Sequence, residues 1–328
     1  MFSRSLCWWF GVRIDASQVP SAIRKAWLQL ELAGIMAENP DRRPTKAQRQ
    51  EAKDAVEAHC AEESAAGKYQ RMSHFPVLWD ARENLLFFGG SNASAIGLFA
   101  DLMQRAFEIE LAPLSIGRLA QNWAERTEQV AALDQLSPAT FHPTHSGGQP
   151  VWTNTHSQAP NFLGNEFLLW LWHTLDNESD TITLEDKSEV TVMFSKSLVL
   201  ECPTGESGKQ TIAAEIPTRL PEALEAIRTG KLPRKAGLVL VRFGQQYDLT
   251  LQAETFSVSG ARIKTDKEAE GREVLLSRID AIRTLSETLD LLFTTFCALR
   301  VTDEWGAQLE RIQRWVHPGN SSKKRSAA

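Results

Sequence analysis

The sequence predicts an α+β fold with mixed or antiparallel sheets, packed helices and a long C-terminal helix. Residues 162–172 carry large apolar side chains on almost every face of a helix, which predicts that this helix is buried on all sides. Residues 238–251 alternate like a β-hairpin around a Gly244-Gln245-Gln246 turn. Apolar residues between Leu275 and Leu299 recur every three or four positions, which predicts one long helix.

Composition is typical of a globular protein. The 328 residues are 42% hydrophobic and 23% charged, which is enough chain for two or three cooperating subdomains. The four cysteines are far apart in sequence and predict reduced thiols of a cytosolic protein. No segment reaches transmembrane length, and the short apolar run near the start lacks the features of a signal peptide. We therefore expect a soluble cytoplasmic protein.

The first third predicts strands mixed with helices. A strand over 6–14 precedes a helix over about 20–36, and Thr45 and Gln48 have the capping-box spacing that starts a second helix toward Ser64. The first helix would turn four residues inward, namely Ile23, Ala26, Trp27 and Leu30. Strands over 77–79 and 85–88, a helix over 93–106 and a strand over 107–111 would complete a mixed sheet with helices on one face.

The remainder predicts a loop, a central region and a helical end. Residues 137–160 are rich in Pro, Gly, Ser, Thr and His. After the apolar helix come strands over 190–194 and 198–201 and a helix over 220–229 that ends on Gly230. The helix over 275–299 would be roughly 36 Å long, and a last helix spans 305–315. We expect regions at 1–136, 137–160 (linker), 161–265, 266–317 and 318–328 (a disordered tail).

Catalytic and metal-binding patterns do not emerge. The stretch 205–211 resembles a phosphate loop, but Pro203 and Gln210 occupy positions that would require Gly and Ser or Thr. His142, His145 and His156 lack a suitably spaced cysteine or carboxylate. There is no nucleophile elbow or zinc-protease pattern. We therefore expect a non-enzymatic protein without metal or cofactor, and rank a hydrolase last.

Charge is segregated along the chain despite a net charge of −5. Two basic clusters are candidates for phosphate contacts, and a third lies at 323–325. The first comprises Arg42, Arg43, Lys46, Arg49 and Lys53, and the second comprises Lys231, Arg234, Lys235 and Arg242. Between Asp176 and Glu189, six acidic residues accompany only one basic residue, Lys187. The more common interpretation of such runs is a solvated face, so charge alone favours DNA binding only weakly.

Several segments in order resemble the recombination-associated protein RdgC family, in a divergent branch. They are 44–56, 75–80 with 84–89, 161–172 and 223–260, followed by the C-terminal apolar seam and 305–315. The resemblance implies an α+β protein that forms a closed ring dimer, binds duplex DNA with little sequence preference and restrains the RecA recombinase. In that branch a further strand and helix precede the segment matching 6–14, so we expect a shortened N-terminus here.

We therefore predict a nucleoid-associated, sequence-independent duplex DNA-binding homodimer of recombination or replication, with no membrane partner. In this hypothesis the two basic clusters converge on one hollow surface and contact phosphates, because Lys and Arg at phosphates read no base edges. The seam 275–299 would be scaffold or, less commonly, part of a dimer contact. The alternative is a structural or regulatory protein that binds another protein and never touches DNA.

Overall fold

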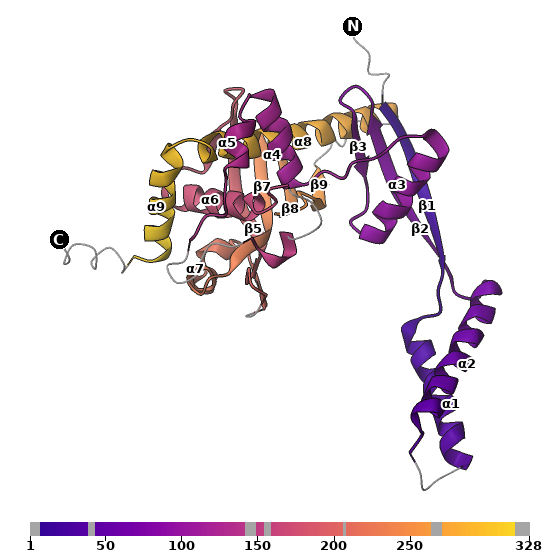
Figure 1. Cartoon of the computed structure of the whole chain (residues 1–328). Coiled ribbons are helices and arrows are strands. Elements are labelled where there is room, and N and C mark those ends of the chain that lie inside the picture. Colours follow the sequence, from indigo (N-terminus) through magenta and orange to yellow (C-terminus); the bar gives the residue numbers. More distant parts are fainter. Residues whose placement is uncertain are drawn as a thin grey trace. The chain divides into compact units, whose positions relative to one another are not determined.

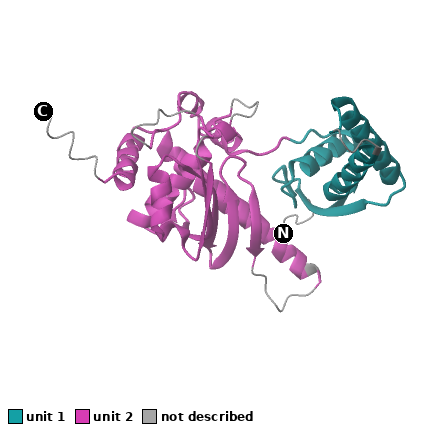
Figure 2. Cartoon of the chain, turned by 90° about the horizontal axis from the view of Figure 1, so that it is seen from below, with its two compact units in different colours: residues 1–111 teal, residues 112–328 magenta. Residues whose placement is uncertain are grey.

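The computed structural model describes residues 7–38, 43–141, 149–153, 159–205, 208–263 and 271–318. It has the α+β class, with antiparallel sheets and a C-terminal helix. The chain divides into two compact units, residues 1–111 and 112–328, which Figure 2 colours separately. This boundary precedes the one expected at 136, because helices α4 (Ile116–Arg126) and α5 (Val130–Asp134) contribute Trp123 and Leu133 to the core of the second unit.

The first unit contains a three-stranded antiparallel sheet in the order β1 (Cys7–Ser17), β2 (Gln70–Asp80) and β3 (Leu85–Phe88). β1 and β2 pair along their whole length, so both are longer than the sequence predicts. Helix α3 (Ala93–Phe107) packs against this sheet (Figure 1). Its side chains Phe99 and Met103 form a buried cluster with Val12 and Val77. The sheet and this helix form one small core.

The predicted strand at 107–111 is wrong. Helix α3 continues to Phe107, and Glu108 then adopts a left-handed conformation with φ 57° that ends the helix. The following residues are irregular, although Ile109 and Leu111 still pack against the small core. Their apolar character therefore reflects burial rather than pairing in a sheet.

Helices α1 (Ser21–Glu38) and α2 (Lys46–Ala65) form a hairpin inserted between β1 and β2. Ile23 and Trp27 of α1 pack with Val56 and Cys60 of α2, as the apolar spacing predicts. The inward position predicted for Leu30 is wrong, since this side chain is 69% exposed, and Ala26 is exposed too. A helix with a single packing partner buries a narrower stripe than one inside a full core.

The sheet of the second unit has six strands. Five follow the order β4 (Thr181–Thr183), β5 (Glu189–Glu201), β7 (Leu232–Arg242), β8 (Gln245–Gln252) and β9 (Val258–Ile263), and β6 (Lys209–Ala214) also pairs with β5. The two strands predicted at 190–194 and 198–201 are one strand, in which the pairing register shifts between Phe194 and Leu198. The predicted β7–β8 hairpin is present, with positive φ at Phe243 and Gly244 in its turn.

Helices complete the second unit. They are α4, α5, α6 (Leu163–Asn177), α7 (Pro221–Arg228), α8 (Arg272–Arg300) and α9 (Glu304–Val316), with short 3₁₀ turns η1 (Val151–Thr153) and η2 (Pro217–Arg219). The burial predicted for the apolar helix is confirmed, because every residue of α6 from Leu163 to Thr174 is buried. The apolar seam of α8 is scaffold within this unit, where Leu289, Leu292 and Phe296 join the same core.

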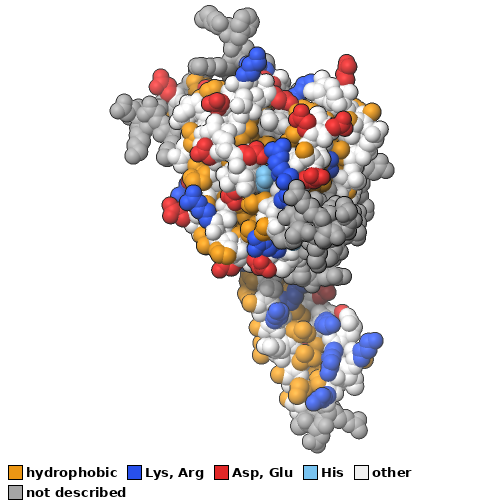
Figure 3. Space-filling view, turned by 90° about the vertical axis from the view of Figure 1, so that its left-hand side faces the viewer, with side chains coloured by type: hydrophobic (Ala, Val, Ile, Leu, Met, Phe, Trp, Pro, Cys, Tyr) orange, Lys and Arg blue, Asp and Glu red, His pale blue; other side chains and the backbone are white. Residues whose placement is uncertain are grey.

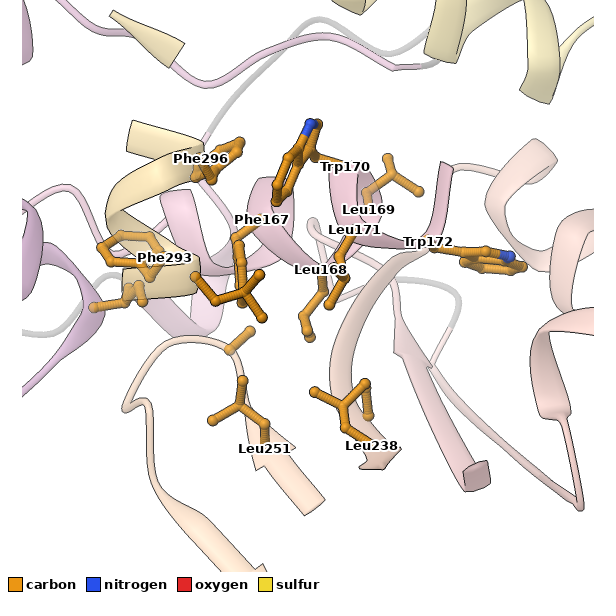
Figure 4. Close-up of a cluster of buried hydrophobic side chains, with 14 of the residues drawn as sticks. Phe167, Leu168, Leu169, Trp170, Leu171, Trp172, Leu238, Leu251, Phe293 and Phe296 are labelled. Atoms are coloured by element: carbon orange, nitrogen blue, oxygen red, sulfur yellow. The ribbon is translucent and has the colours of Figure 1, made fainter. Parts of the chain in front are cut away.

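α6 is the centre of that core. Figure 4 shows Leu168 and Leu171 directed toward Leu238 and Leu251 of the sheet, whereas Phe167 lies on the side of α8. The Phe167 ring centroid is 5.6 Å from that of Phe293. The helix therefore needs apolar side chains on more than one face, which explains its sequence.

Candidate nucleic-acid interface

The first basic cluster lies at the start of α2. Thr45 caps the helix, since its hydroxyl accepts from the Gln48 backbone N–H while the Gln48 side chain accepts from the Thr45 N–H. The capping box predicted from sequence is therefore confirmed. Ala52, Val56 and Cys60 are the buried residues of this helix. Because this stripe faces α1, the remaining faces of α2 are open to solvent.

Four cations of this cluster are exposed, namely Arg43, Lys46, Arg49 and Lys53. In the part of the chain that the structure describes, none of the four forms an ion pair. Figure 3 shows Lys and Arg side chains grouped on the α1–α2 hairpin, which is the narrow lower part of the view. The fifth cation, Arg42, lies outside the described residues, as does the cluster at 323–325.

The position of these cations in the helix adds to the positive potential. The first turn of α2 contains no acidic residue, and Lys46 is its first residue. The N-terminus of a helix carries the equivalent of about half a positive charge, so cations placed here repel it and anions are attracted. Glu51 and Asp54 are also exposed, and the second half of the helix carries Glu57, Glu62 and Glu63. The basic surface is thus confined to the beginning of α2.

The second cluster is far less available. Lys231 is half-buried, and its ammonium donates to the Gln210 side chain at 3.0 Å. Arg234 forms ion pairs with Glu201 at 2.7 Å and Glu254 at 2.9 Å, and its guanidinium lies 5.1 Å from the centre of the Trp152 ring. Lys235 is half-buried on β7. Arg234 is therefore neutralised by two carboxylates, whereas Lys231 and Lys235 keep their charge but are only half-exposed.

The pKa of Arg234 agrees with this pairing. Burial alone would lower the pKa, but the hydrogen bonds that Arg234 donates to Glu201 and Glu254, together with their negative charge, outweigh burial and hold the pKa above its ordinary value. A guanidinium neutralised by two carboxylates attracts a phosphate much less than a free one. The main role of Arg234 is therefore to stabilise the fold through these ion pairs.

Arg242 occupies a place that argues against the predicted phosphate contact. It is 2% exposed, and its guanidinium donates to side chains from two other segments, the loop 186–188 and α8. Nε donates to Ser188 Oγ at 3.1 Å, and Nη2 donates to Asp186 Oδ2 at 2.5 Å. Nη1 donates to Glu287 Oε2 and Thr288 Oγ1, both at 3.3 Å. Because DNA cannot reach this group without unfolding its surroundings, we leave Arg242 out of the interface.

The carboxylates that engage the two arginines were not anticipated from sequence. These carboxylates are distant in the chain from the arginines that they contact, so no local sequence pattern predicts the pairs; they are Glu201, Glu254 and Glu287. One signal did exist for Arg242. Ala236, Leu238 and Leu240 alternate on the buried face of β7, and Arg242 continues that alternation.

The two basic clusters belong to different units, the first to residues 1–111 and the second to residues 112–328. Their convergence on one hollow surface stays a prediction. The phosphate-loop interpretation of 205–211 finds no support in the local structure, since strand β6 begins at Lys209 where a phosphate loop would open a helix. His142, His145 and His156 lie outside the described residues.

In the segments with described side chains, no group of three or more His, Cys, Asp or Glu residues could hold a metal ion. Within the same segments, no helix combines the length and apolar character needed to cross a bilayer. No protein-family model matches the sequence, and no curated protein matches it either.

Proposed function

We propose that this chain is a non-enzymatic protein that binds duplex DNA without sequence preference, as its resemblance to the RdgC family implies. In this proposal it has an RdgC-like fold, acts in recombination or replication on the nucleoid, forms a homodimer and restrains a RecA-type recombinase. The observation that carries the proposal is the group of exposed cations at the start of α2, which lack ion-pair partners in the described segments.

These cations suit phosphate contacts for a physical reason. A cation that stabilises a fold is usually paired with a carboxylate or placed near a helix C-terminus. Arg234 and Arg242 follow the first pattern, whereas Lys46 and Arg49 follow neither. Free charges beside the positive end of a helix form a site for a polyanion, and phosphates satisfy both features at once.

A second candidate function has an observation of its own. The first unit exposes several large apolar side chains, including Leu98, Leu102 and Phe107 of α3. Leu98 and Leu102 are one turn apart and share a face of α3, and exposed apolar side chains grouped on one face are typical of protein interfaces. The alternative is therefore a protein-interaction role without DNA binding.

Fluorescence anisotropy with a labelled duplex of arbitrary sequence tests the proposal. If the four exposed cations at the start of α2 and just before it each neutralise one phosphate, log affinity falls against log salt with a slope of about −3.6. The double variant Lys46→Glu, Arg49→Glu removes two contacts, so the slope falls to about −1.8 and affinity at about 0.1 M salt drops at least ~60-fold. The loss is the same for duplexes of unrelated sequence, because phosphate contacts carry no base information.

The chain offers a matched control at the other end of the hairpin. Arg24 and Lys25 of α1 are exposed, and Arg24→Glu, Lys25→Glu makes the same change in net charge within the same unit. We expect this control to keep most of the salt slope. Equal losses in both variants would show a general charge effect, and no binding at low salt by a folded sample would reject DNA binding. Light scattering tests the dimer, which has twice the chain's 36.6 kDa.

A further inference from the structure

A cavity of about 370 Å³ lies in the second unit, and none of the residues that line it belongs to the basic clusters. Its walls come from the segment 135–140, the end of α8 and one face of α9. Trp305, Leu309 and Gln313 follow one another at intervals of four residues, so they share that face. Leu136 and Pro138 line the cavity from the segment 135–140. The cavity thus has apolar surfaces on two sides, and its volume falls in the range typical of small-molecule sites.

One charged group lines this cavity. Arg300 is 7% exposed and sits at the end of α8, where its guanidinium carbon lies 4.9 Å from the centre of the Trp305 ring. Nε donates to Glu166 Oε2 at 2.7 Å, and Nη2 donates to the Ser137 carbonyl at 2.8 Å. Glu166 is itself fixed by the Ala139 N–H at 2.6 Å. The guanidinium is therefore held rigidly from two sides.

This arrangement leaves donors unused. A guanidinium has five N–H donors, and the contacts above engage Nε and Nη2. Across the segments that the structure describes, Nη1 has no hydrogen-bond partner. Nη1 is not one of the buried polar atoms that lack a partner, so solvent reaches it and it is free to donate to an acceptor that enters the cavity.

We propose that this cavity binds a small organic monocarboxylate, whose carboxylate accepts from Nη1 of Arg300 and whose apolar body lies between Trp305, Leu309 and Pro138. The planar guanidinium presents its N–H groups in the geometry that carboxylates prefer. Glu166 occupies the Nε side, so the ligand approaches on the opposite side of the guanidinium. The indole of Trp305 and the side chain of Leu309 supply the apolar contact that an aromatic or branched acid requires.

Fluorine NMR with 4-fluorobenzoate on the full chain tests the proposal, because free and bound probe differ in shift and line width. The expected Kd is below about 1 mM. The neutral analogue 4-fluorobenzamide has nearly the same shape without the charge, and it should bind at least ~10-fold more weakly, since hydrogen bonds to an ionised acceptor are roughly twice as strong. This comparison uses the wild-type protein alone and does not depend on the folding of any variant.

Two variants locate the site. Leu309→Trp fills the cavity from its apolar wall and should abolish binding of 4-fluorobenzoate. Glu310→Gln changes the adjacent, exposed residue of α9 and should leave binding unchanged. The proposal would be overturned by equal affinity for the two probes or by unchanged binding to a folded Leu309→Trp protein. It would also be overturned if 4-fluorobenzoate at about 5 mM, enough to saturate a site with the expected Kd, showed no change in shift or line width.

Discussion

Replacing Arg242 with methionine separates a role in folding from a role in DNA binding. Methionine keeps much of the length and volume of the side chain but removes every donor of the guanidinium. The structure predicts a loss of stability in the second unit, because the hydrogen bonds to Ser188, Asp186 and Thr288 disappear together. DNA affinity should stay within a factor of two of wild type, since Arg242 is buried.

The size of the effect follows from the surroundings of the guanidinium. Breaking a buried ion pair by removing one partner costs about 3–5 kcal/mol. The lower end applies here, because Asp186 and Glu287 are partly exposed and regain water when the arginine is gone. Thr288 keeps its bond to the Thr284 carbonyl at 2.6 Å. A loss of about 3 kcal/mol lowers the Tm of a unit of this size by roughly 6–12 °C.

Calorimetry gives the change in Tm, and anisotropy at several salt concentrations gives the DNA contacts of the same sample. The expected result for Arg242→Met is a lower Tm with an unchanged salt slope. The double variant Lys46→Glu, Arg49→Glu should show a reduced salt slope without a lower Tm of the second unit. A folded Arg242→Met protein with normal Tm and a slope reduced by about one unit would refute the assignment of this arginine to the fold.

Two further predictions concern the second unit. Burial lowers the pKa of His173 below its ordinary 6.5, and the charge of Glu178 opposes this effect. Between the lowered pKa and 6.5 the unfolded chain therefore binds more protons than the folded chain. The contribution of His173 to stability is complete above pH 6.5 and is lost as pH falls through this window. The free energy of unfolding in urea should differ less between about pH 7.5 and about pH 5.5 for His173→Gln than for wild type. Gly164→Ala should cost about 3 kcal/mol, because its Cβ would overlap the Ala253 carbonyl oxygen and backbone cannot move aside easily. Gly306→Ala on α9, where nothing lies within 4 Å of the added Cβ, should be neutral or stabilising, and equal losses in the two glycine variants would contradict the steric explanation.

Sequence patterns predicted the elements whose signal is local. Helix α6 could be placed because its apolar side chains surround the whole helix, and α2 could be placed because its capping box involves Thr45 and Gln48 alone. The exposed cations at the start of α2 could be predicted as well, because they lie in the first turns after this capping box. These features depend on residues within a few positions of one another, which is the range over which periodicity and capping are informative.

Features that depend on distant partners were missed. The apolar run at 107–111 looks like a strand, but it lies beside a sheet without pairing to it. Arg242 looked available because no acidic residue is near it in sequence, yet Asp186 and Glu287 reach it from segments more than forty residues away. Composition cannot reveal such pairs, because only the tertiary structure brings these carboxylates to the guanidinium.

The cations of α2 should oppose the stability of their own helix, and this yields a last prediction. Lys46 is the first residue of α2, where the helix dipole disfavours positive charge and favours Glu. The hairpin has few buried residues to compensate, with Val19, Val56 and Cys60 at its centre. Lys46→Glu alone should therefore stabilise α2 by about 0.5 kcal/mol while it weakens DNA binding. Hydrogen exchange of the α2 amides measures the first effect and anisotropy the second. If the variant instead loses protection, Lys46 supports its own helix and the dipole argument is wrong; if it keeps full affinity, Lys46 does not contact a phosphate.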